Sequence, residues 1–413
     1  MSPQNERETF RGLAVKRRGS KPWERDLKRY LRGPRHRWIV TAPFAFRPSL
    51  RRELEDLALQ SIEKHGAGFC FEARISEIYP VLMRLQCASR LFLLVDSFRA
   101  GAAEELYRRI VTLPWELLLH DGIALSVHVS LRRCRIEHEG AAEHTLYQAL
   151  ERRAEEAGLS LSVSNDAPSQ MIELFGEDNH FELRLDACGE QLYRRGYRPL
   201  VGPAPIRENI AASLLQWYRI ECGPFSLFVD PMCGSGTFPI EAWAMASHFP
   251  LAGHRRFSIF LWPVFSKAAW NWEAHRLYGE ADITAADEPL FWGSDKDPKM
   301  VHISRLNGER AGAAGNIGFL HEDFFHLSPQ DLFSSDHVSR VEGNRGALLA
   351  INPPYGVRLK GDDNLFVRII DRKKRIWQGW DLLLLAPRSL ALPPGKKSID
   401  FENGGIPMKC ILF

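Results

Sequence analysis

Two glycines and an acidic residue stand directly after a short apolar run near the middle of the chain. The apolar residues 225–229 are typical of a buried strand, and Asp230 closes it. Gly234 and Gly236 follow in a turn, and from Thr237 onward apolar residues recur at helical spacing. Because glycine carries no Cβ and the first turn of a helix has free N–H groups, this arrangement can bind a polar ligand through bare backbone. Such a turn also ends many ordinary strands, which is the structural alternative.

A second apolar run, residues 347–351, ends in a polar and proline-rich loop. Asn352, Pro353, Pro354 and Tyr355 follow the run directly. The prolines fix φ and hold the residues before them extended, so the loop is expected to be stiff. The amide oxygen of Asn352 and the carbonyl of Pro353 can then converge on one planar amine, while Tyr355 stacks on the ring that carries it. The structural alternative is a rigid turn with a packed tyrosine.

The two stretches together resemble a known enzyme family. The series Asp-Pro-Met-Cys-Gly-Ser-Gly-Thr (230–237), followed by Asn-Pro-Pro-Tyr-Gly (352–356), is similar to the class I S-adenosyl-L-methionine-dependent amino-methyltransferases. More narrowly, it resembles the bacterial RNA guanine-N2 methyltransferases that carry a THUMP domain, in the form that matches their N-terminal half. Residues 192–198 and 204–212 resemble the segment that leads into the catalytic domain of that family. The resemblance covers roughly residues 38–413.

The resemblance implies a binding site for S-adenosyl-L-methionine. The residues expected to bind this cofactor are Asp230, Pro231, Cys233, Gly234, Gly236, Thr237, Asp295, Asp297, Asp323, Phe324 and Asn352. Asp230 is expected to face the methionine amino group, and Asp295 to accept hydrogen bonds from the ribose hydroxyls. The catalytic residues implied are Asn352, Pro353, Pro354 and Tyr355.

Three further residues of this set have specific expected roles. Asp297 precedes a predicted helix, where it is either a second cofactor contact or an N-cap. Asp323 is expected to accept from the adenine amine, and Phe324 or Phe325 to lie against the adenine ring. For each acidic residue of the site, the structural alternative is a helix cap or a salt-bridge partner.

Strands alternate with helices through the second half of the chain. Strands are expected at 225–230, 290–294, 317–320, 347–351 and 381–386, helices at 237–247, 298–311 and 364–377, and a final strand pair within 398–413. This alternation predicts a doubly wound, mainly parallel sheet, which binds ligands at the carboxyl ends of its strands. The expected fold class is therefore α/β, with a Rossmann-like class I methyltransferase domain.

The pattern of strands and helices in the first half predicts an α+β region of ferredoxin-like and THUMP type. Strands at 38–42, 69–75 and 91–95, with helices at 48–59 and 79–88, suit a ferredoxin-like module. The predicted domains are a basic, flexible tail at 1–37, a ferredoxin-like module at 38–77, a THUMP domain at 78–190, a linker with a cofactor-covering helix at 191–222 and the methyltransferase domain at 223–413. A tryptophan-rich insertion at 248–289 either roofs the site or covers the edge of the sheet.

Five arginines are candidates for contact with RNA. Arg132 and Arg133 follow a predicted strand and can meet phosphates, or they form a solvated edge. Arg194, Arg195 and Arg198 lie among tyrosines, a composition that suits backbone contact with stacking. The alternative for these three is structural, because arginine often ties two domains together through backbone carbonyls.

Composition and charge limit the other classes of function. The formal net charge of the 413 residues is only +3, yet residues 1–38 hold 12 Lys and Arg against 4 Asp and Glu. This basic segment favours salt-dependent attraction to RNA phosphates, or it is a solvated leader. Seven cysteines without a C-x-x-C pair indicate a reducing compartment and no metal site. No apolar run approaches the ~20 residues that span a bilayer, so a cytoplasmic protein away from membranes is expected. The protein is also expected to be a monomer.

Three functions compete on these grounds. The leading one is methylation of the exocyclic N2 of a guanine in large-subunit ribosomal RNA, free or within a pre-ribosomal particle; tRNA is the alternative substrate. Adenine-N6 and protein glutamine-N5 methyltransferases share the Asn-Pro-Pro-Tyr loop, but the expected RNA-binding half favours RNA. The alternative from another class is a non-catalytic RNA-binding assembly factor with an inactive cofactor site.

Overall fold

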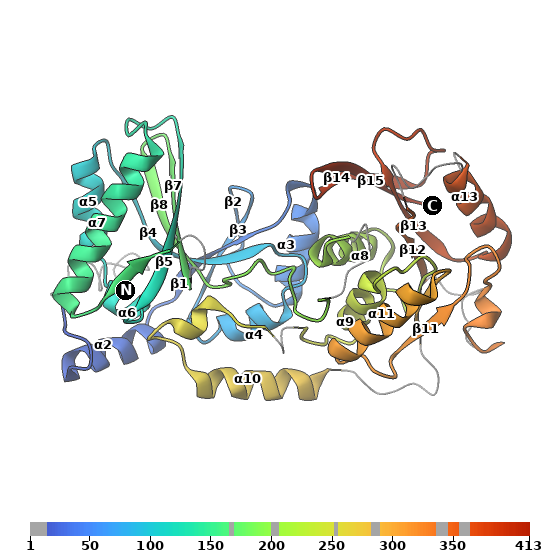
Figure 1. Cartoon of the computed structure of the whole chain (residues 1–413), viewed down its shortest axis with the longest axis horizontal. Helices are drawn as coiled ribbons and strands as arrows, with labels where there is room; N and C mark the ends of the chain where they lie inside the picture. Colours follow the sequence, from blue (N-terminus) through green and yellow to red (C-terminus); the bar gives the residue numbers. More distant parts are fainter. Residues whose placement is uncertain are drawn as a thin grey trace.

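The computed structural model describes residues 15–164, 169–199, 206–251, 255–281, 290–335, 346–354 and 364–413. Within these ranges the chain forms two β-sheets, one in each half, which lie side by side along the longest axis of the molecule (Figure 1). Tyr355, one of the predicted catalytic residues, lies outside the described residues.

The first sheet has eight strands among the described residues. In sheet order they are β2 (Glu63–His65), β3 (Gly68–Ala73), β1 (His36–Thr41), β4 (Arg90–Arg99), β8 (His180–Asp186), β7 (Gln170–Glu177), β5 (Ile123–Arg132) and β6 (Leu161–Val163). β4 pairs antiparallel with both β1 and β8. The sheet therefore runs without a break across the domain boundary predicted at residues 77 and 78.

Both halves of the molecule contain helices. Those of the first half are α2 (Lys21–Arg32), α3 (Arg47–Asp56), α4 (Ile78–Arg84), α5 (Ala103–Val111), α6 (Trp115–Leu118) and α7 (Glu139–Ala157). Those of the second half are α8 (Glu208–Cys222), α9 (Thr237–Ala246), α10 (Lys267–Glu280), α11 (Pro298–Arg310) and α13 (Leu365–Ile376). Short 3₁₀ turns are η2 (Phe44–Phe46), η3 (Ser258–Leu261) and η4 (Pro329–Asp331).

Part of the predicted flexible tail is an ordered helix, so for these residues the prediction was wrong. α2 begins after Ser20, whose side chain accepts a hydrogen bond from the Trp23 backbone N–H at 3.3 Å. Trp23 and Tyr30 are buried, and the Trp23 indole donates to the carbonyl of Glu116 at 2.9 Å. The apolar residues Trp23, Leu27 and Tyr30 recur at helical spacing. The many charged residues between them made this helical spacing hard to recognise in the sequence.

The second sheet has seven strands among the described residues. In sheet order they are β11 (Ile317–His321), β10 (Phe291–Asp295), β9 (Leu227–Asp230), β12 (Ala347–Ile351), β13 (Asp381–Pro387), β15 (Ile406–Leu412) and β14 (Lys397–Asn403). Pairing is parallel from β11 to β13, and β15 is antiparallel to both of its neighbours. This confirms the predicted doubly wound α/β class, with strand ends within two residues of expectation.

Both faces of the central strands β9 and β12 are buried, which explains why these two strands are almost entirely apolar. In β9, Phe228 belongs to one hydrophobic cluster and Val229 to the other. In β12, Leu348 and Leu349 likewise belong to opposite clusters. Helices on both sides of a parallel sheet remove the alternation of polar and apolar residues that a half-exposed strand would show.

The described part of the tryptophan-rich insertion packs against the first half of the molecule. The Trp262 ring stacks on that of Trp38 at a centroid distance of 6.2 Å, and its indole donates to Gln170 Oε1 at 2.8 Å. The Ser266 backbone N–H donates to the Tyr79 hydroxyl at 2.9 Å. These contacts join the insertion to strands β1 and β7 and to helix α4 of the first half, which neither predicted alternative described. α10 lies along the same side of the molecule, bridging toward the second half (Figure 1).

The described residues contain neither a membrane-spanning helix nor a metal-binding cluster. No helix in them combines the length and apolar character needed to cross a membrane. Nor does any group of three or more His, Cys, Asp or Glu side chains among them stand close enough to hold a metal ion. All seven cysteines are free thiols.

Candidate active site

The predicted site residues follow neighbouring parallel strands of the second sheet. The pairing register sets Gly293 of β10 opposite Asp230 at the end of β9, and Leu349 of β12 opposite Val229. Because the carboxyl ends of parallel strands meet at one edge, the segments after β9, β10, β11 and β12 converge there. Asn352 follows β12 at the same edge.

The glycine turn after β9 uses backbone conformations that favour glycine. Gly234 has φ +53° and Gly236 has φ +84°. Open space surrounds the position of a Gly234 Cβ, whereas a Gly236 Cβ would lie 3.0 Å from Ser304 Cβ and 3.3 Å from the Phe319 ring. Gly236 is also the N-cap of α9 and offers no side-chain cap, so the first N–H groups of this helix are available to a ligand.

Asp295, at the end of β10, holds the glycine turn in place. Its Oδ2 accepts from the Gly234 backbone N–H at 3.0 Å, and its Oδ1 accepts from the Asp297 backbone N–H at 2.9 Å. An ionised carboxylate has about four acceptor positions, so further donors can still bind. Asp297 itself caps α11, since its side chain accepts from the Lys299 backbone N–H at 2.9 Å. The cap was one of the two roles predicted for Asp297.

Asp230 is a buried acid next to this turn. Its side chain is almost fully buried, and Oδ1 accepts from the Met232 backbone N–H at 3.1 Å. Burial raises the pKa of the Asp230 carboxyl well above its ordinary value, and the nearby Asp295 charge adds to this effect. A cationic amine bound beside Asp230 would oppose this shift, because an opposite charge favours the ionised carboxylate.

The predicted adenine surface divides into one buried ring and one accessible ring. Phe324 is only 1 % exposed and packs against Trp377 at a centroid distance of 6.4 Å, so it belongs to the core rather than to a ligand surface. Phe325 is partly buried, with the Arg368 guanidinium 4.2 Å from its ring centroid. Asp323 Oδ1 accepts from the Phe325 backbone N–H at 2.9 Å. Sequence alone did not distinguish the two rings, because both follow the same strand.

Asn352 carries an unsatisfied polar atom. Its side-chain Oδ1 is buried and has no hydrogen-bond partner among the described residues. Such atoms are rare in folded proteins, and each one calls for an explanation. Pro353 is buried and Pro354 is exposed. An acceptor held without a partner directly after β12 is suited to receive a donor from a ligand.

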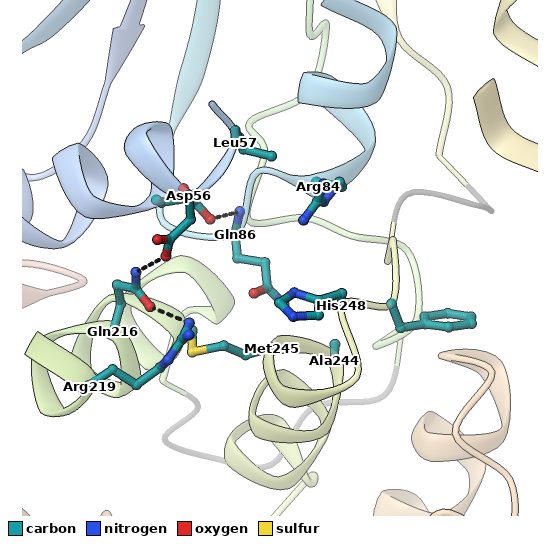
Figure 2. A pocket seen from close by; sticks show the side chains of 11 residues that line it. Asp56, Leu57, Arg84, Gln86, Gln216, Arg219, Ala244, Met245 and His248 are labelled. Carbon is teal, nitrogen blue, oxygen red and sulfur yellow. Dashed lines mark hydrogen bonds between the residues drawn. The ribbon is translucent and has the colours of Figure 1, made fainter. Parts of the chain in front are cut away.

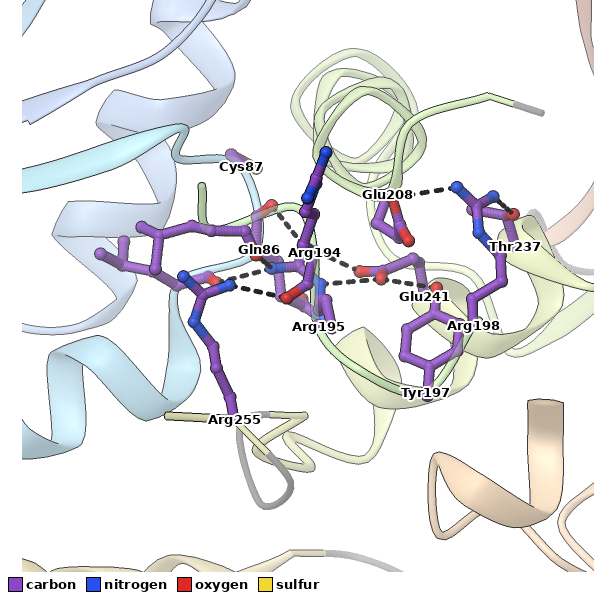
Figure 3. A network of polar contacts seen from close by, with 12 residues as sticks. Gln86, Cys87, Arg194, Arg195, Tyr197, Arg198, Glu208, Thr237, Glu241 and Arg255 are labelled. Carbon is purple, nitrogen blue, oxygen red and sulfur yellow. Dashed lines mark hydrogen bonds and ion pairs between the residues drawn. The ribbon is translucent and has the colours of Figure 1, made fainter. Parts of the chain in front are cut away.

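Two of the arginines predicted to contact RNA lie in the interior instead (Figure 3). Arg195 is 4 % exposed, and its Nε donates to Glu241 Oε1 at 2.9 Å. Arg198 pairs with Glu208 at 3.2 Å and donates to the Thr237 hydroxyl at the start of α9. Their burial does not suit contact with RNA and fits the structural alternative. The remaining three, Arg132, Arg133 and Arg194, are exposed.

Glu241 was not among the predicted site residues. Glu241 occupies the middle of α9, whose other side chains are almost all apolar and buried. A single carboxylate inside such a helix indicates a buried partner, because an unpaired buried charge is strongly unfavourable. That signal was present in the sequence, but the identity of the partner was not.

A small pocket lies between the two halves, where α3 and α4 meet α8 and α9 (Figure 2). Its volume is about 50 Å³, and none of its lining residues belongs to the predicted site. Gln216 donates to Asp56 Oδ2 at 3.1 Å and accepts from Arg219 at 3.0 Å, so much of the polar lining is paired internally. His248, at the opposite wall, has φ +55°.

The second sheet and the helices around it have a Rossmann-like methyltransferase fold. Residues 195–390 match the family model described as RMKL-like, methyltransferase domain. The match agrees with S-adenosyl-L-methionine as the cofactor.

Two curated relatives bear the name ribosomal RNA large subunit methyltransferase K/L. The protein from Methylococcus capsulatus is 29% identical over 389 residues, which cover 91% of this chain and 51% of that protein. The protein from Magnetococcus marinus is 30% identical over 391 residues, covering 91% of this chain and 53% of that protein. The chain therefore spans about half the length of the curated relatives it matches.

Solved structures share the architecture of both halves. SMU.472, in its complex with SAH, matches with a TM-score of 0.74 at 23% identity and covers 92% of this chain and 98% of that chain. TrmN from Thermus thermophilus matches with a TM-score of 0.64 at 20% identity, covering 91% of this chain and 99% of that chain. These similarities confirm the predicted fold class.

Proposed function

We propose that this chain transfers a methyl group from S-adenosyl-L-methionine to the exocyclic N2 of a guanine in large-subunit ribosomal RNA. The observation that carries the proposal is the buried Oδ1 of Asn352, which has no hydrogen-bond partner among the described residues and lies at the same sheet edge as the glycine turn. The names of the two curated relatives support the choice of ribosomal RNA.

The residues at this edge fit the cofactor. The open space at Gly234 and the uncapped start of α9 leave backbone N–H groups for its polar part. Asp295 would accept from the ribose hydroxyls with its remaining acceptor positions, and Asp230 would pair with the amino group. Asp323 and Phe325 would receive the adenine. The cofactor supplies an electrophilic methyl group on a sulfonium.

The chain would act on the target amine mainly by orientation. Asn352 Oδ1 and the Pro353 carbonyl would accept the two N–H groups of the amine and aim its lone pair outward. A stiff loop holds both acceptors in place before the substrate arrives, so little reorganisation is needed at the moment of reaction. The base must be unpaired or flipped out of its helix to reach these acceptors. We propose the THUMP region, residues 78–190, as the part that binds the surrounding RNA.

The test uses the purified chain with tritiated S-adenosyl-L-methionine, a large-subunit ribosomal RNA transcript and a tRNA mixture, followed by nucleoside mass spectrometry. The expected product is N2-methylguanosine in the large-subunit RNA. Asn352→Ala should lower the rate by about 100-fold or more, because one preorganised hydrogen bond at a reacting group contributes this much.

Other outcomes identify the alternatives. N2-methylguanosine only in tRNA would retain the chemistry and change the substrate, whereas N6-methyladenosine would contradict the guanine assignment. No detectable binding of S-adenosyl-L-methionine to the folded protein by calorimetry would favour the non-catalytic assembly factor.

A further inference from the structure

The solvent face of α2 is strongly basic. Its exposed cations are Lys21, Arg25, Lys28, Arg29 and Arg32, and Glu24 is the one exposed acidic residue of this helix. The cations stand three or four positions apart along the helix, a spacing at which like charges repel by a few tenths of a kcal/mol per pair. The face is therefore unfavourable by itself, and a bound polyanion would relieve the repulsion.

The opposite face of α2 fixes the helix to the first half of the molecule. Trp23, Asp26 and Tyr30 are buried, and Asp26 pairs with Lys16. The Tyr30 ring stacks on that of His36 at a centroid distance of 4.4 Å. Because the helix is anchored along its whole length, its cations hold a constant spacing, unlike those of a flexible leader.

Several exposed arginines of the described chain form ion pairs, whereas Arg25 and Arg32 of α2 form none. Arg133 contacts Asp178 and Glu177 at 2.7 and 2.9 Å, and other helices hold pairs four residues apart, as in α3 and α7. Within the described residues, Lys21, Arg25, Lys28 and Arg32 have no side-chain ion pair. These four cations remain available for external anions.

We propose that α2 is a second RNA-binding surface, which contacts the phosphate backbone of the substrate at a distance from the methyl-transfer site. The inference rests on the proposed function for the identity of the RNA. α2 and the second sheet lie at opposite ends of the longest axis (Figure 1). An RNA that contacts both must therefore extend along the first half of the molecule.

The burial pattern favours RNA over a membrane surface. Helices that lie on membranes insert an apolar face between the lipids. The apolar residues of α2 are turned inward, since Trp23 and Tyr30 are buried and Leu27 and Leu31 pack against the hydrophobic core. Only the charged face remains outside, and it suits a polyanion such as the RNA backbone.

The test compares two variants with the same loss of charge. Lys21→Gln, Arg25→Gln, Lys28→Gln and Arg32→Gln are combined in the first. The control combines Arg51→Gln, Arg52→Gln, Arg108→Gln and Arg152→Gln, all exposed and each paired with an acid four residues away. Binding of a large-subunit ribosomal RNA transcript is measured without cofactor across a salt series.

For the α2 variant we expect an affinity about tenfold or more below that of the wild type near 0.1 M salt. We also expect the slope of log affinity against log salt to shrink by about two to four, because fewer counterions are released. The control should stay close to the wild type, and a variant that exchanges Lys and Arg at the four α2 positions should retain binding. Equal affinity and slope for the α2 variant and the control would overturn the proposal.

Two further arms separate contact from other effects. A stem-loop of about 20 nucleotides is too short to contact α2 and the methyl-transfer site at once. The difference in affinity between the wild type and the α2 variant should therefore be smaller for this stem-loop than for the long transcript. An equal loss for short and long RNA would overturn the extended footprint. If the α2 variant binds phosphatidylserine vesicles less tightly than the wild type but binds RNA equally well, the proposal of an RNA surface is overturned in favour of a membrane surface.

Failure of the proposed function is distinguishable from failure of this inference. If the wild type methylates no RNA but its RNA affinity still depends on α2, the inference stands and the proposed activity falls. If methyl transfer occurs with equal RNA affinity for the α2 variant and the control, the activity stands and the inference falls.

Discussion

Arg195 and Glu241 form a buried ion pair between the two halves of the molecule. The guanidinium Nε lies 2.9 Å from Oε1, and the two side chains are 4% and 0% exposed. Arg195 also donates to the carbonyls of Leu85 and Gln86, which belong to the first half. Glu241 belongs to α9, the helix that begins at the glycine turn. The pair therefore connects the proposed RNA-binding half to the element that would position the cofactor.

Removing one member of this pair should strongly destabilise the protein. Arg195→Gln or Glu241→Gln is expected to lower the free energy of unfolding by about 3–5 kcal/mol, because the remaining charge stays buried without a partner. Urea unfolding of each single variant and of the double variant measures the coupling. Arg51→Gln, which breaks an exposed pair, is the control and should cost less than about 1 kcal/mol. A buried-pair variant no less stable than this control would contradict the prediction.

Glu53 should make stability depend on pH. Its carboxylate accepts from the Gln86 and Cys87 backbone N–H groups at 2.6 and 3.0 Å, and burial raises its pKa from 4.5 to about 7. Folding therefore favours the protonated form. The resulting stabilisation is fully present below about pH 4.5 and is lost as the pH rises through about 7.

The variant Glu53→Gln tests this dependence, because its amide does not titrate and still presents an oxygen to the two N–H groups. The melting temperature of the variant minus that of the wild type should increase between about pH 5 and about pH 8. A difference that is constant over this range would show that Glu53 titrates alike in the folded and unfolded chain.

Asp295 and Asp297 should differ in their effect on the cofactor. Asp295→Ala removes the acceptor of the Gly234 N–H, so the turn loosens and the affinity for S-adenosyl-L-methionine should fall about tenfold or more. Asp297→Ala removes a helix cap, which costs about 1 kcal/mol of stability. Its cofactor affinity should change less than about threefold, within the spread expected from a remote cap. Calorimetry of both variants checks the contrast, and equal losses of affinity would assign both residues to the cofactor.

The two glycines of the turn should respond differently to alanine. Gly234→Ala meets open space, so its cost is that of a left-handed conformation, about 1–2 kcal/mol. Gly236→Ala adds a contact at 3.0 Å with Ser304 Cβ and should lose about 1–3 kcal/mol more. Gly140→Ala in α7, which also meets open space, is the control and should stabilise the protein by about 0.5–1 kcal/mol. Thermal unfolding ranks the three variants. If the Gly234→Ala variant is less stable than the Gly236→Ala variant, the prediction is contradicted.

The secondary structure of the second half could be predicted from the sequence because it depends on local interactions. The strand, turn and helix around Gly234 and the strand before Asn352 depend on neighbours within ten residues, through glycine φ angles, proline rigidity and apolar runs. The five strands around the site consequently lie within two residues of their expected bounds. The N-cap role of Asp297 was likewise among the predictions, because caps are local.

Contacts between distant residues decided the rest. Arg195 reaches the carbonyl of Leu85, 110 positions away, and no local pattern distinguishes such an arginine from one that contacts RNA. Phe324 and Phe325 are equivalent in sequence until Trp377 buries one of them. α2 becomes a fixed helix because Trp23 binds Glu116. By itself the sequence predicted the fold class from local pattern, and it predicted the candidate site from the resemblance of its motifs to a known family. Only the tertiary structure decided which charges and rings are buried, because burial depends on partners that folding brings together.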